Sequence, residues 1–550
     1  MKKIILLFLF LALSNIYSQT QNNIGKIYQN YLDNGVLKTK VITTPMINNG
    51  VGLMSNETQL PLNNNIMMPR IRWSFTDPAA IANNVAISGN GLLNVVGWYL
   101  NSMRISTYDT NSNTPLWDYN TYASPSYYNY VNVSDTAGAI AAGSYHNFYL
   151  FHKGSSVPFF NFDLTTLHDT GIAGPVALTF NGNFLVACVQ RNDSSTVLGF
   201  NSTSTTPVWR YRMATAVYGV KIAGYDSLLI VNTYYTWAVL NTYTGAVRAT
   251  GQIYGTTGGT QTQQAISGDG NYIGIINYYG WVYCSHWNGS AYSQVWSSQE
   301  PPGTYYNWIS TVDISTDGLY LAIGTLNFLS SSSYDGKVKY YVIANGNTPL
   351  WTKAGFGDEV SQVMFSRNSK ILAACTWGDV SNTVDDIQMF KTSSNTNVPL
   401  YTVHTPGSLF ALGVSDDGRS VVAGGKLVHA RAFGSGGTFF NVYVDTSMNP
   451  VNIHNISNSI PSTYNLKQNY PNPFNPTTKI EFELPTSESV SLKVYDVTGK
   501  EVATLVNQTL STGKYEADFS ADKYQLSSGL YFYKMTTPNF SKVLKMILIK

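Results

Sequence analysis

A short phrase returns eight times along the middle of this chain and constrains its fold more than any other feature. Each copy is an alternating apolar run that ends in a polar turn, as in VAISGNG and VDISTDG, and a second apolar stretch follows the turn. This pattern is typical of a β-hairpin with Gly, Asp or Asn in the turn. The copies lie 44 to 51 residues apart and begin at Val85, Val131, Val176, Val220, Gln264, Val312, Val363 and Leu412.

Each unit contains two more strand-like segments after the hairpin. The fourth segment often carries Trp, as at Trp117, Trp209, Trp296 and Trp351. Four strands in about 47 residues, without helical periodicity, are typical of one blade of a β-propeller. A blade has two apolar faces and needs a neighbour on each side, which a closed ring provides. We therefore predict an all-β protein with an eight-bladed β-propeller over residues 70–446; seven blades is the alternative if one unit is degenerate.

The two ends of the repeat region complement each other. The eighth unit ends after its third strand, Thr438–Val444, and an orphan Trp-bearing strand, Ile71–Thr76, precedes the first unit. A strand at a sheet edge leaves backbone N–H and C=O groups unpaired. We predict that Ile71–Thr76 completes the last blade and fastens the ring.

The tails of several units, such as GFNSTSTTPVWRY and IANGNTPLW, resemble the repeats of pyrroloquinoline-quinone-type and WD40-like propellers. The resemblance implies a fold only. Quinone dehydrogenases carry an adjacent Cys pair over the cofactor and a calcium site, and this sequence has no adjacent Cys pair and no clear set of Ca²⁺ ligands. We therefore predict no cofactor and no metal.

The N-terminus has the features of a secretion signal. Met1-Lys2-Lys3 is followed by the apolar run Ile4–Leu13 and then by small residues, the pattern of a signal peptide, which we place at residues 1–18. The apolar run is shorter than the ~20 residues that span a bilayer, so we predict no transmembrane segment. Residues 19–69 are rich in Asn and irregular, with one possible hairpin near residues 25–44.

The C-terminal part has a different composition. Residues 447–463 are short, polar and contain Pro, which predicts a linker. From Tyr464 to Lys550, segments such as KIEFELP and SVSLKVYDVTG alternate polar and apolar residues, so each strand has one buried face. We predict a small Ig-like β-sandwich over residues 464–550.

The amino-acid sequences of these strands contain specific motifs. NYPNPFNPTTKIEFELP, VYDVTGKEV and SSGLYFYKM, in this order, resemble the C-terminal sorting domain of type IX secretion (Por) cargo. The resemblance implies a Bacteroidetes-like host, export through the periplasm, recognition by the outer-membrane translocon, and a final location outside the cell or on its surface. The residues that match the sorting motifs are Pro471, Pro473, Phe474, Pro476, Asp496, Gly499, Gly529 and Tyr531.

The prolines of this motif also have a mechanical interpretation. Pro471, Pro473 and Pro476 each fix φ and lack a backbone donor. We expect them to hold the segment extended and to prevent it from joining a neighbouring sheet. That would keep a sorting tag separate from its cargo.

Motifs for catalysis are few. The seven His show no metal-ligand spacing, so we assign no catalytic residue and leave enzymatic activity open. Cys188, Cys284 and Cys375 lie in apolar stretches, where buried free thiols are expected. The net charge is +2 and no run of Lys or Arg exceeds a pair, which predicts no nucleic-acid partner.

Aromatic residues gather in one set of connections. In a blade, the second-to-third and fourth-to-first connections open on the same face of the ring, and Tyr and Trp there suit contact with a glycan or a protein. Packing between blades is the alternative explanation. The predicted ligand-binding residues are Trp98, Tyr127, Tyr128, Tyr234, Tyr235, Tyr278, Tyr279, Trp281, Tyr305, Tyr306 and Trp308.

Three functions therefore remain open for the exported propeller. The first is binding of an extracellular glycan or protein. The second is a secreted hydrolase or lyase acting on polysaccharide, for which only scattered acids such as Glu300, Asp358 and Glu359 lie in the right connections. The third is scaffolding at the cell surface.

Overall fold

The computed structural model of the chain divides into two units, Met1–Gly50 with Ile71–Ser447 and Val51–Arg70 with Met448–Lys550. The predicted signal peptide lies outside the described residues, whereas the hairpin expected near residues 25–44 is present as β1 (Lys26–Asp33) and β2 (Val36–Thr43). The structure describes residues 26–33, 36–43 and 70–550, except for 101–102, 122–128, 168–170, 192–193, 254–261, 278, 302–306, 433, 435, 447–452, 458–460, 487, 511, 523 and 525.

Within the described part of the first unit, eight antiparallel sheets follow the two-stranded sheet β1–β2, and these eight make up the repeat region. The first four sheets are formed by β4 (Ala80–Ile87), β5 (Leu93–Leu100), β6 (Arg104–Asp109) and β7 (Pro115–Asn120); β8 (Asn129–Val133), β9 (Ile140–Ser144), β10 (Asn147–Phe151) and β11 (Phe160–Asp163); β12 (Ile172–Leu178), β13 (Phe184–Gln190), β14 (Ser195–Asn201) and β15 (Trp209–Met213); β16 (Val217–Ile222), β17 (Leu228–Thr233), β18 (Thr236–Asn241) and β19 (Val247–Gln252).

The next four sheets continue the same pattern, and one of them has the extra two-residue strand β26. They are formed by β20 (Thr262–Ile266), β21 (Tyr272–Asn277), β22 (Trp281–Trp287) and β23 (Tyr292–Gln299); β24 (Trp308–Ile314), β25 (Tyr320–Phe328), β26 (Tyr334–Asp335), β27 (Val338–Val342) and β28 (Trp351–Lys353); β29 (Val360–Phe365), β30 (Ile371–Thr376), β31 (Ile387–Lys391) and β32 (Tyr401–Val403); β33 (Leu409–Val414), β34 (Ser420–Lys426), β35 (Gly437–Tyr443) and β3 (Arg70–Asp77). Two short 3-10 helices follow β11 and β27, namely η2 (Leu164–Leu167) and η3 (Ile343–Asn345).

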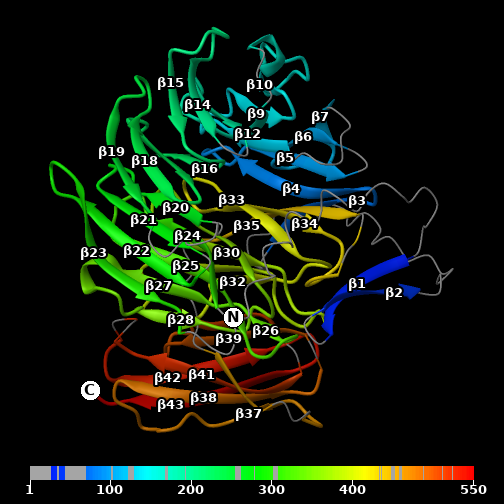
Figure 1. Cartoon of the computed structure of the whole chain (residues 1–550). Helices are drawn as coiled ribbons and strands as arrows, with labels where there is room; N and C mark the ends of the chain where they lie inside the picture. The colour runs from blue at the N-terminus through cyan, green and yellow to red at the C-terminus, as the bar shows by residue number, and fades with distance from the viewer. Residues whose placement is uncertain are drawn as a thin grey trace. The chain divides into compact units, whose positions relative to one another are not determined.

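The sheets form a closed ring. The first strand of each sheet packs against the first strands of its two neighbours, and β33 of the last sheet packs against β4 of the first. In Figure 1 the colour runs around this ring from blue to yellow, and the yellow sheet lies beside the blue one. The first unit is therefore a β-propeller whose first strands are innermost.

Strand β3 closes the ring as the sequence predicts. It is the outer strand of the last sheet, in the order β3-β35-β34-β33, although the other three strands come from the end of the propeller. Arg72 of β3 donates to Asn441 Oδ1 of β35 at 3.2 Å and to Ser420 Oγ of β34 at 2.8 Å. The first and the last strand of the propeller region are thus joined in one sheet.

A Trp in the outer strand fastens four of the described sheets to the sheet that follows. Its indole N–H donates to a backbone carbonyl of that sheet, which satisfies the one polar atom of a large apolar side chain. Trp73 of β3 makes the same bond to the first sheet, across the closure. These bonds are Trp73 to Thr110 O (2.8 Å), Trp117 to Lys153 O (2.8 Å), Trp209 to Thr242 O (3.0 Å) and Trp296 to Ile343 O (3.1 Å). Trp351 is buried in the corresponding strand of the sixth sheet, but its indole nitrogen has no hydrogen-bond partner among the described residues.

A Ser or Thr hydroxyl recurs in the repeated phrase and stabilises the hairpin turn. In seven of the eight turns a buried Ser or Thr side chain accepts the backbone N–H that starts the second strand, at 2.9–3.1 Å. Only the fourth unit, with Ala223, lacks it. A side-chain acceptor of this kind stabilises a tight turn. The three predicted free cysteines are confirmed as buried and unpaired.

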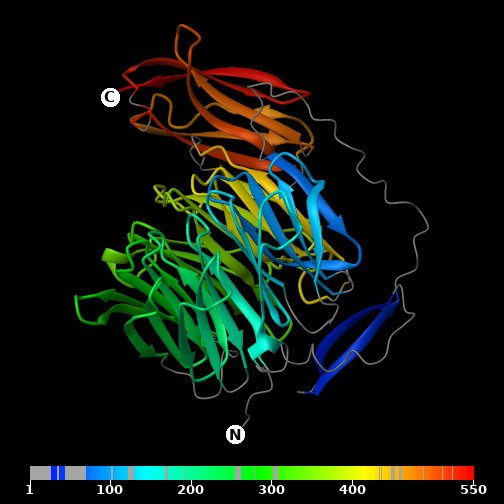
Figure 2. The ribbon, with the colours of Figure 1, turned by 90° about the horizontal axis from the view of Figure 1, so that it is seen from above.

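The described residues of the second unit between Ile453 and Lys550 form two four-stranded sheets around one core, drawn in orange and red in Figure 2. The sheet orders are β36-β41-β38-β37 and β40-β39-β42-β43. Side chains of both sheets, such as Phe482 and Tyr533, are buried in the same cluster. The strands are β36 (Ile453–Ser457), β37 (Asn465–Leu466), β38 (Thr477–Leu484), β39 (Glu488–Tyr495), β40 (Glu501–Leu510), β41 (Gly513–Ser520), β42 (Gly529–Thr536) and β43 (Ser541–Leu548).

Two expectations about this unit are wrong. Strand β36 lies inside the predicted linker 447–463 and pairs with β41, so this stretch belongs to the sheet. The proline-rich segment does join a neighbouring strand: Phe474 N–H donates to Ile547 O at 2.9 Å, and Ile549 N–H donates to Phe474 O at 3.0 Å. The segment can pair because Phe474 itself is not a proline and keeps both backbone groups.

Candidate functional site

The propeller presents two different faces. The second-to-third connections and the links from one sheet to the next open on one side, which we call the loop face. The hairpin turns between first and second strands, and the third-to-fourth connections, open on the opposite side, which we call the turn face. This follows from the alternating direction of antiparallel strands in each sheet.

On the turn face, each hairpin turn is hydrogen-bonded to the next, and the bonds complete a circle. The donor and acceptor pairs are Asn90 N to Asp135 O (3.0 Å), Asp135 N to Phe180 O (3.0 Å), Phe180 N to Asp226 Oδ2 (2.8 Å), Tyr225 N to Gly268 O (3.0 Å), Gly268 N to Thr316 O (2.9 Å), Asp317 N to Ser369 Oγ (3.2 Å), Asn368 N to Asp416 O (2.9 Å) and Asp416 N to Gly89 O (2.8 Å). We call these contacts the turn ring.

Arg367 crosses the centre of the turn ring. It belongs to the seventh turn, and its guanidinium donates to the Asp135 carboxylate of the second turn and to the Gly224 carbonyl of the fourth. It also lies over the Phe180 ring of the third turn, at 4.6 Å. At Gly89 a side chain would collide with Asp416 and Asp135, so the turns approach as closely as a glycine allows. The channel is therefore closed by protein at the turn face.

The structure places the predicted ligand-binding residues in different surroundings. Five of them, Tyr127, Tyr128, Tyr278, Tyr305 and Tyr306, lie outside the described residues. The remaining six are described, and one of these six requires a correction.

Trp98 is not a surface residue. Its exposed fraction is 0%, its indole N–H donates to Ser106 Oγ at 3.0 Å, and the Arg104 guanidinium lies 4.9 Å from its ring. The ring also packs edge-on against Phe75 of β3, at 5.6 Å. Trp98 therefore packs the first sheet against the last, as the alternative explanation predicts, and is wrongly placed among the ligand-binding residues.

Four of the predicted residues lie on the fourth and fifth sheets, which are neighbours in the ring. We define the aromatic sector as Tyr218, Tyr234, Tyr235, Tyr279, Trp281 and Tyr283. The Tyr218 and Tyr234 rings are 4.1 Å apart, and Trp281 stacks on Tyr283 at 5.8 Å and 14°. Tyr235 is 37% exposed and the other rings of the sector are half-buried. Burial, together with a hydrogen bond that Tyr218 donates to Tyr234, raises the pKa of Tyr218.

Short polar side chains fix the backbone beneath these rings. Thr233 Oγ1 accepts the Tyr235 amide at 3.2 Å, and Asn277 Oδ1 accepts the amides of Tyr279 and Trp281, both at 3.1 Å. Side chains of this kind commonly fold back on the following amides and fix tight turns. The aromatic sector is therefore held on ordered connections.

The last predicted residue, Trp308, lies in a different region, which includes Phe328, Tyr334 and Arg431. It packs edge-on against Phe328 at 5.7 Å, and Phe328 packs edge-on against Tyr334 at 5.2 Å. Tyr334 in turn lies 4.5 Å beneath the Arg431 guanidinium. We define the charged sector by the ionisable groups gathered around this arginine: Asp358, Glu359, Asp386, Lys426, His429 and Arg431.

An ion pair stands at the centre of the charged sector. Arg431 Nη2 donates to Asp358 Oδ1 at 3.1 Å, and Asp358 is only 1% exposed. Asp358 Oδ2 and Arg431 Nε are buried and have no hydrogen-bond partner among the described residues. Two unpaired polar atoms at one buried ion pair are costly and call for a further partner.

The loop that carries Arg431 is strained and held from both sides. Ala430 has φ of 52°, in the left-handed region that non-glycine residues rarely adopt. Its carbonyl accepts from Lys426 Nζ at 2.6 Å, and its amide donates to Trp377 O at 3.0 Å. His429 and Arg431 are the residues directly before and after this strained position.

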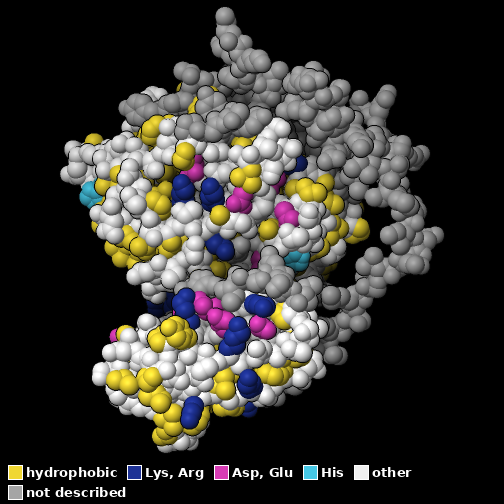
Figure 3. All heavy atoms as spheres, turned by 90° about the horizontal axis from the view of Figure 1, so that it is seen from below, with side chains coloured by type: hydrophobic (Ala, Val, Ile, Leu, Met, Phe, Trp, Pro, Cys, Tyr) yellow, Lys and Arg dark blue, Asp and Glu magenta, His cyan; other side chains and the backbone are white. Residues whose placement is uncertain are grey.

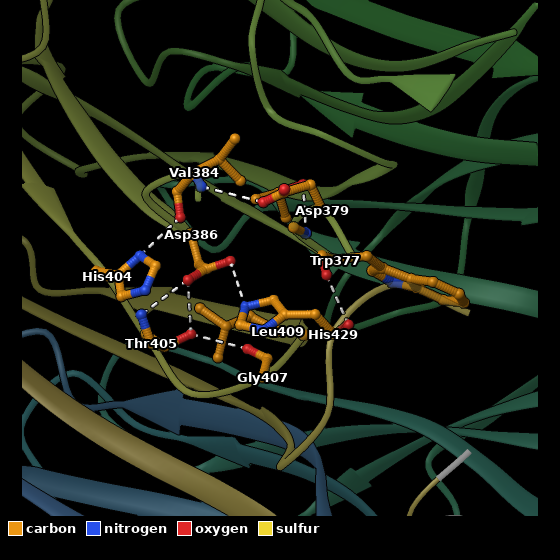
Figure 4. A network of polar contacts seen from close by, with 12 residues as sticks. Trp377, Asp379, Val384, Asp386, His404, Thr405, Gly407, Leu409 and His429 are labelled. Atoms are coloured by element: carbon orange, nitrogen blue, oxygen red, sulfur yellow. Dashed lines mark hydrogen bonds and ion pairs between the residues drawn. The ribbon is translucent and has the colours of Figure 1, made fainter. Parts of the chain in front are cut away.

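A buried carboxylate orients His429, as Figure 4 shows. His429 Nε2–H donates to Asp386 Oδ1 at 3.0 Å, and Asp386 Oδ2 accepts the Thr405 amide at 2.7 Å. The other ring nitrogen, Nδ1, has no hydrogen-bond partner among the described residues. Gly378 permits this approach, because a side chain there would meet both His429 and Asp386. An aspartate that holds one imidazole nitrogen leaves the other available for proton transfer.

Burial changes the acidity of two groups of this sector. Burial first, and then the Asp358 carboxylate, raise the pKa of Glu359 to about 7, against the opposing effect of Arg431. Burial also lowers the pKa of Lys426 to about 8. Among the acids that the sequence analysis named, Glu300 is instead a structural ion-pair partner of Lys339 and accepts from Asn327 at 3.2 Å.

Sequence reasoning missed most of the charged sector because its members are far apart in the chain. His429 and Asp386 are 43 positions apart, and Arg431 and Asp358 are 73 positions apart. One signal was available: the eighth unit carries Lys426, His429 and Arg431 within six residues, in a chain with only 12% charged residues.

Three further features concern the described residues: surface charge, groups of metal ligands and helices of membrane-spanning length. On the surface seen in Figure 3, acidic and basic side chains lie beside each other and do not form large patches of one sign. No group of three His, Cys, Asp or Glu side chains that could hold a metal ion occurs in the described part of the chain. The described residues also include no helix with the length and apolar character of a membrane span.

The residues of the sorting motif occupy defined places in the second unit. Phe474 is buried and packs on Phe519 at 5.7 Å, and Tyr531 is buried and donates to Ser527 O at 2.8 Å. Asp496 and Gly499 form the turn between β39 and β40, where Asp496 Oδ1 accepts the Thr498 amide at 2.9 Å. The residues at or near the surface are Pro471, Pro473, Pro476 and Gly529.

Fold and motif together define an exported protein with a β-propeller body and a C-terminal sorting module. Residues 468–550 match the family model described as the secretion system C-terminal sorting domain. The predicted sorting domain is thereby confirmed. The protein is cargo of the type IX secretion system, whose machinery recognises this domain, and it is exported to the cell surface or the extracellular space.

Comparison with solved structures gives similar folds at low identity. The β-propeller domain of Cps50 (Swd1) from Myceliophteria thermophila is 12% identical, covers 56% of this chain and 96% of its own, and has a TM-score of 0.41. The C-terminal WD40 domain of Sif2 is 11% identical, covers 69% of this chain and 99% of its own, and has a TM-score of 0.48. A comparison with curated proteins finds no match.

Proposed function

We propose that this protein binds an extracellular polysaccharide on the loop face of its propeller. The aromatic sector is the observation that carries the proposal. Half-buried Tyr and Trp rings of two adjacent sheets offer flat apolar surface with hydroxyl and indole groups at its edge. Such rings bind sugar rings through apolar contact and hydrogen bonds, at a low cost in side-chain entropy.

The closed turn face supports the same choice of side. The turn ring and Arg367 fill the channel there with satisfied hydrogen bonds, which leaves few groups for a ligand. On the loop face, by contrast, rings are partly exposed on an ordered backbone. A site built on a fixed backbone loses less conformational entropy when a ligand binds, and this favours affinity.

The test is a glycan array with the purified chain, followed by titration with the polysaccharide that binds. Tyr235→Ala and Trp281→Ala should each weaken binding by about 1–3 kcal/mol, roughly 5- to 150-fold, as hot-spot residues do. Their melting temperatures should change little, because both rings are partly exposed.

Tyr225→Ala is the matched control. Tyr225 is 62% exposed but lies on the turn face, so its removal should leave binding unchanged. Equal losses for Tyr225→Ala and Tyr235→Ala, or a glycan array on which the chain binds nothing, would contradict the proposal.

A further inference from the structure

Two side chains of the charged sector that can transfer protons lie on the loop face, and each has an atom without a hydrogen-bond partner among the described residues. The Glu359 carboxyl is half-buried and accepts no hydrogen bond from the described residues, and His429 Nδ1 is likewise unpaired. The buried Asp358 Oδ2 and Arg431 Nε beside them are also unpaired. Unpaired polar atoms that converge in this way indicate a site completed by a ligand.

Backbone hydrogen bonds place the two groups on adjacent chain segments. The Trp377 amide donates to Glu359 O and the Trp377 carbonyl accepts from the Ala430 amide, both at 3.0 Å. Three chain segments therefore lie side by side, with Glu359 on one side of Trp377 and His429, next to Ala430, on the other. A general acid and a general base on two sides of a bound sugar chain are what direct hydrolysis by water requires.

Local strain at this point also favours a functional role. Ala430 is held in the left-handed region by Lys426 and Trp377, and residues kept in such conformations cluster at functional sites. Arg431 pairs with Asp358 through Oδ1, which favours the charged form of that carboxylate. Glu359 has no such ion pair among the described residues, and it is therefore the acid that we assign to proton transfer.

We propose that the charged sector is a hydrolytic site that cleaves the polysaccharide bound on the loop face, with Glu359 as general acid and His429 as general base. The inference rests on the proposed polysaccharide binding. Asp386 would be a positioning residue, because it contacts only His429 and Thr405 in this network.

The step balances without any cofactor. Glu359 gives its proton to the bridging oxygen as the bond from that oxygen to the anomeric carbon breaks. A water molecule attacks the anomeric carbon, and His429 Nδ1 accepts the proton that the water loses. Two shorter chains result, one with a new reducing end, and solvent returns the proton from His429 to Glu359. The raised pKa of Glu359 keeps a large part of this carboxyl protonated near neutral pH, as a general acid requires.

The experiment measures new reducing ends released from each polysaccharide that the full chain binds. Glu359→Gln and His429→Asn should each lower the rate at least 100-fold while the dissociation constant changes less than 3-fold. Asp386→Asn should lower kcat at unchanged KM and shift the pH dependence of the rate, which a merely structural change would not do.

Neighbouring residues of the same types provide controls. Asp385→Asn and His404→Asn alter an exposed Asp–His contact of 3.9 Å beside the site and should keep the parent rate. A polysaccharide that binds through Tyr235 and Trp281 but yields no reducing ends would overturn the inference and leave the proposed binding intact. Products that carry an unsaturated sugar would overturn the hydrolytic step, and a chain that binds no polysaccharide would overturn both.

Discussion

Glu359 makes the folded state sensitive to pH. Its folded pKa of about 7 lies above the usual carboxyl value of about 4.3, so the folded protein holds this proton more tightly than the unfolded chain. The stability linked to it is complete below the unfolded pKa and is lost as the pH rises through 7. We expect Glu359→Gln to melt at the parent's temperature near pH 4.5 and at a higher temperature at pH 8.

Calorimetric melting from pH 4 to pH 9 would check this expectation. Glu300→Gln is a useful comparison, because Glu300 is buried against Lys339 and its loss should destabilise the protein at pH 8. A parent and a Glu359→Gln variant whose melting curves stay parallel across the whole range would show that Glu359 does not hold its proton in the folded state.

Single residues were the hardest part of the site to predict. The repeat pattern assigns Trp98 and Trp281 to the same connection of their units and therefore predicts the same role for both. Trp98 lies within β5 and is buried where Phe75 of β3 packs against it, whereas Trp281 begins β22 and is half-buried. The difference depends on a segment that is distant in sequence, and local pattern cannot contain it. His429 and Asp386 were missed for the same reason.

At the scale of elements, β3 is the strand whose loss should matter most. Removing residues 70–77 would expose the edge of β35 and delete Trp73, whose ring packs against Tyr108 and Phe439 at 5.3 and 5.5 Å. We expect a large fall in melting temperature, and Trp73→Ala alone should cost about 3–5 kcal/mol of unfolding free energy.

Removing residues 19–69 is the control, and it should leave the melting temperature close to that of the parent. Thermal and denaturant melts of the parent and of these three variants measure the effects. If loss of β3 were tolerated as well as loss of residues 19–69, the ring would not depend on this strand.

Elements with local signals were predicted well, and elements defined by distant pairing were not. The repeated hairpins follow from alternation and from Ser, Asp and Gly in the turns, all within a few residues. Strand β36 has no such signal and becomes a strand only because β41 pairs with it. The segment around Phe474 is similar, since its partners are Ile547 and Ile549, more than seventy residues away.

At the scale of the whole molecule, the two units have separate cores, which allows the sorting domain to be removed. Deletion of residues 453–550, with β36 included, should leave a propeller that folds but stays in the periplasm of a host with type IX secretion. Fractionation of cells and medium measures its location, and a cooperative melt of the recovered protein confirms folding.

The intact chain in a host that lacks the translocon should be retained in the same compartment. Truncated protein found in the medium or on the cell surface in the same amount as the intact chain would mean that export does not require the second unit.

Arg367 has a consequence for the length of any polymer that this protein handles. A chain cannot thread through a pore that an arginine spans from the seventh turn to the second and fourth. A long molecule must therefore lie across the loop face, entering and leaving sideways. Access would then require no free end, and the interior of a polymer fixed in a matrix or a wall would be as reachable as its terminus.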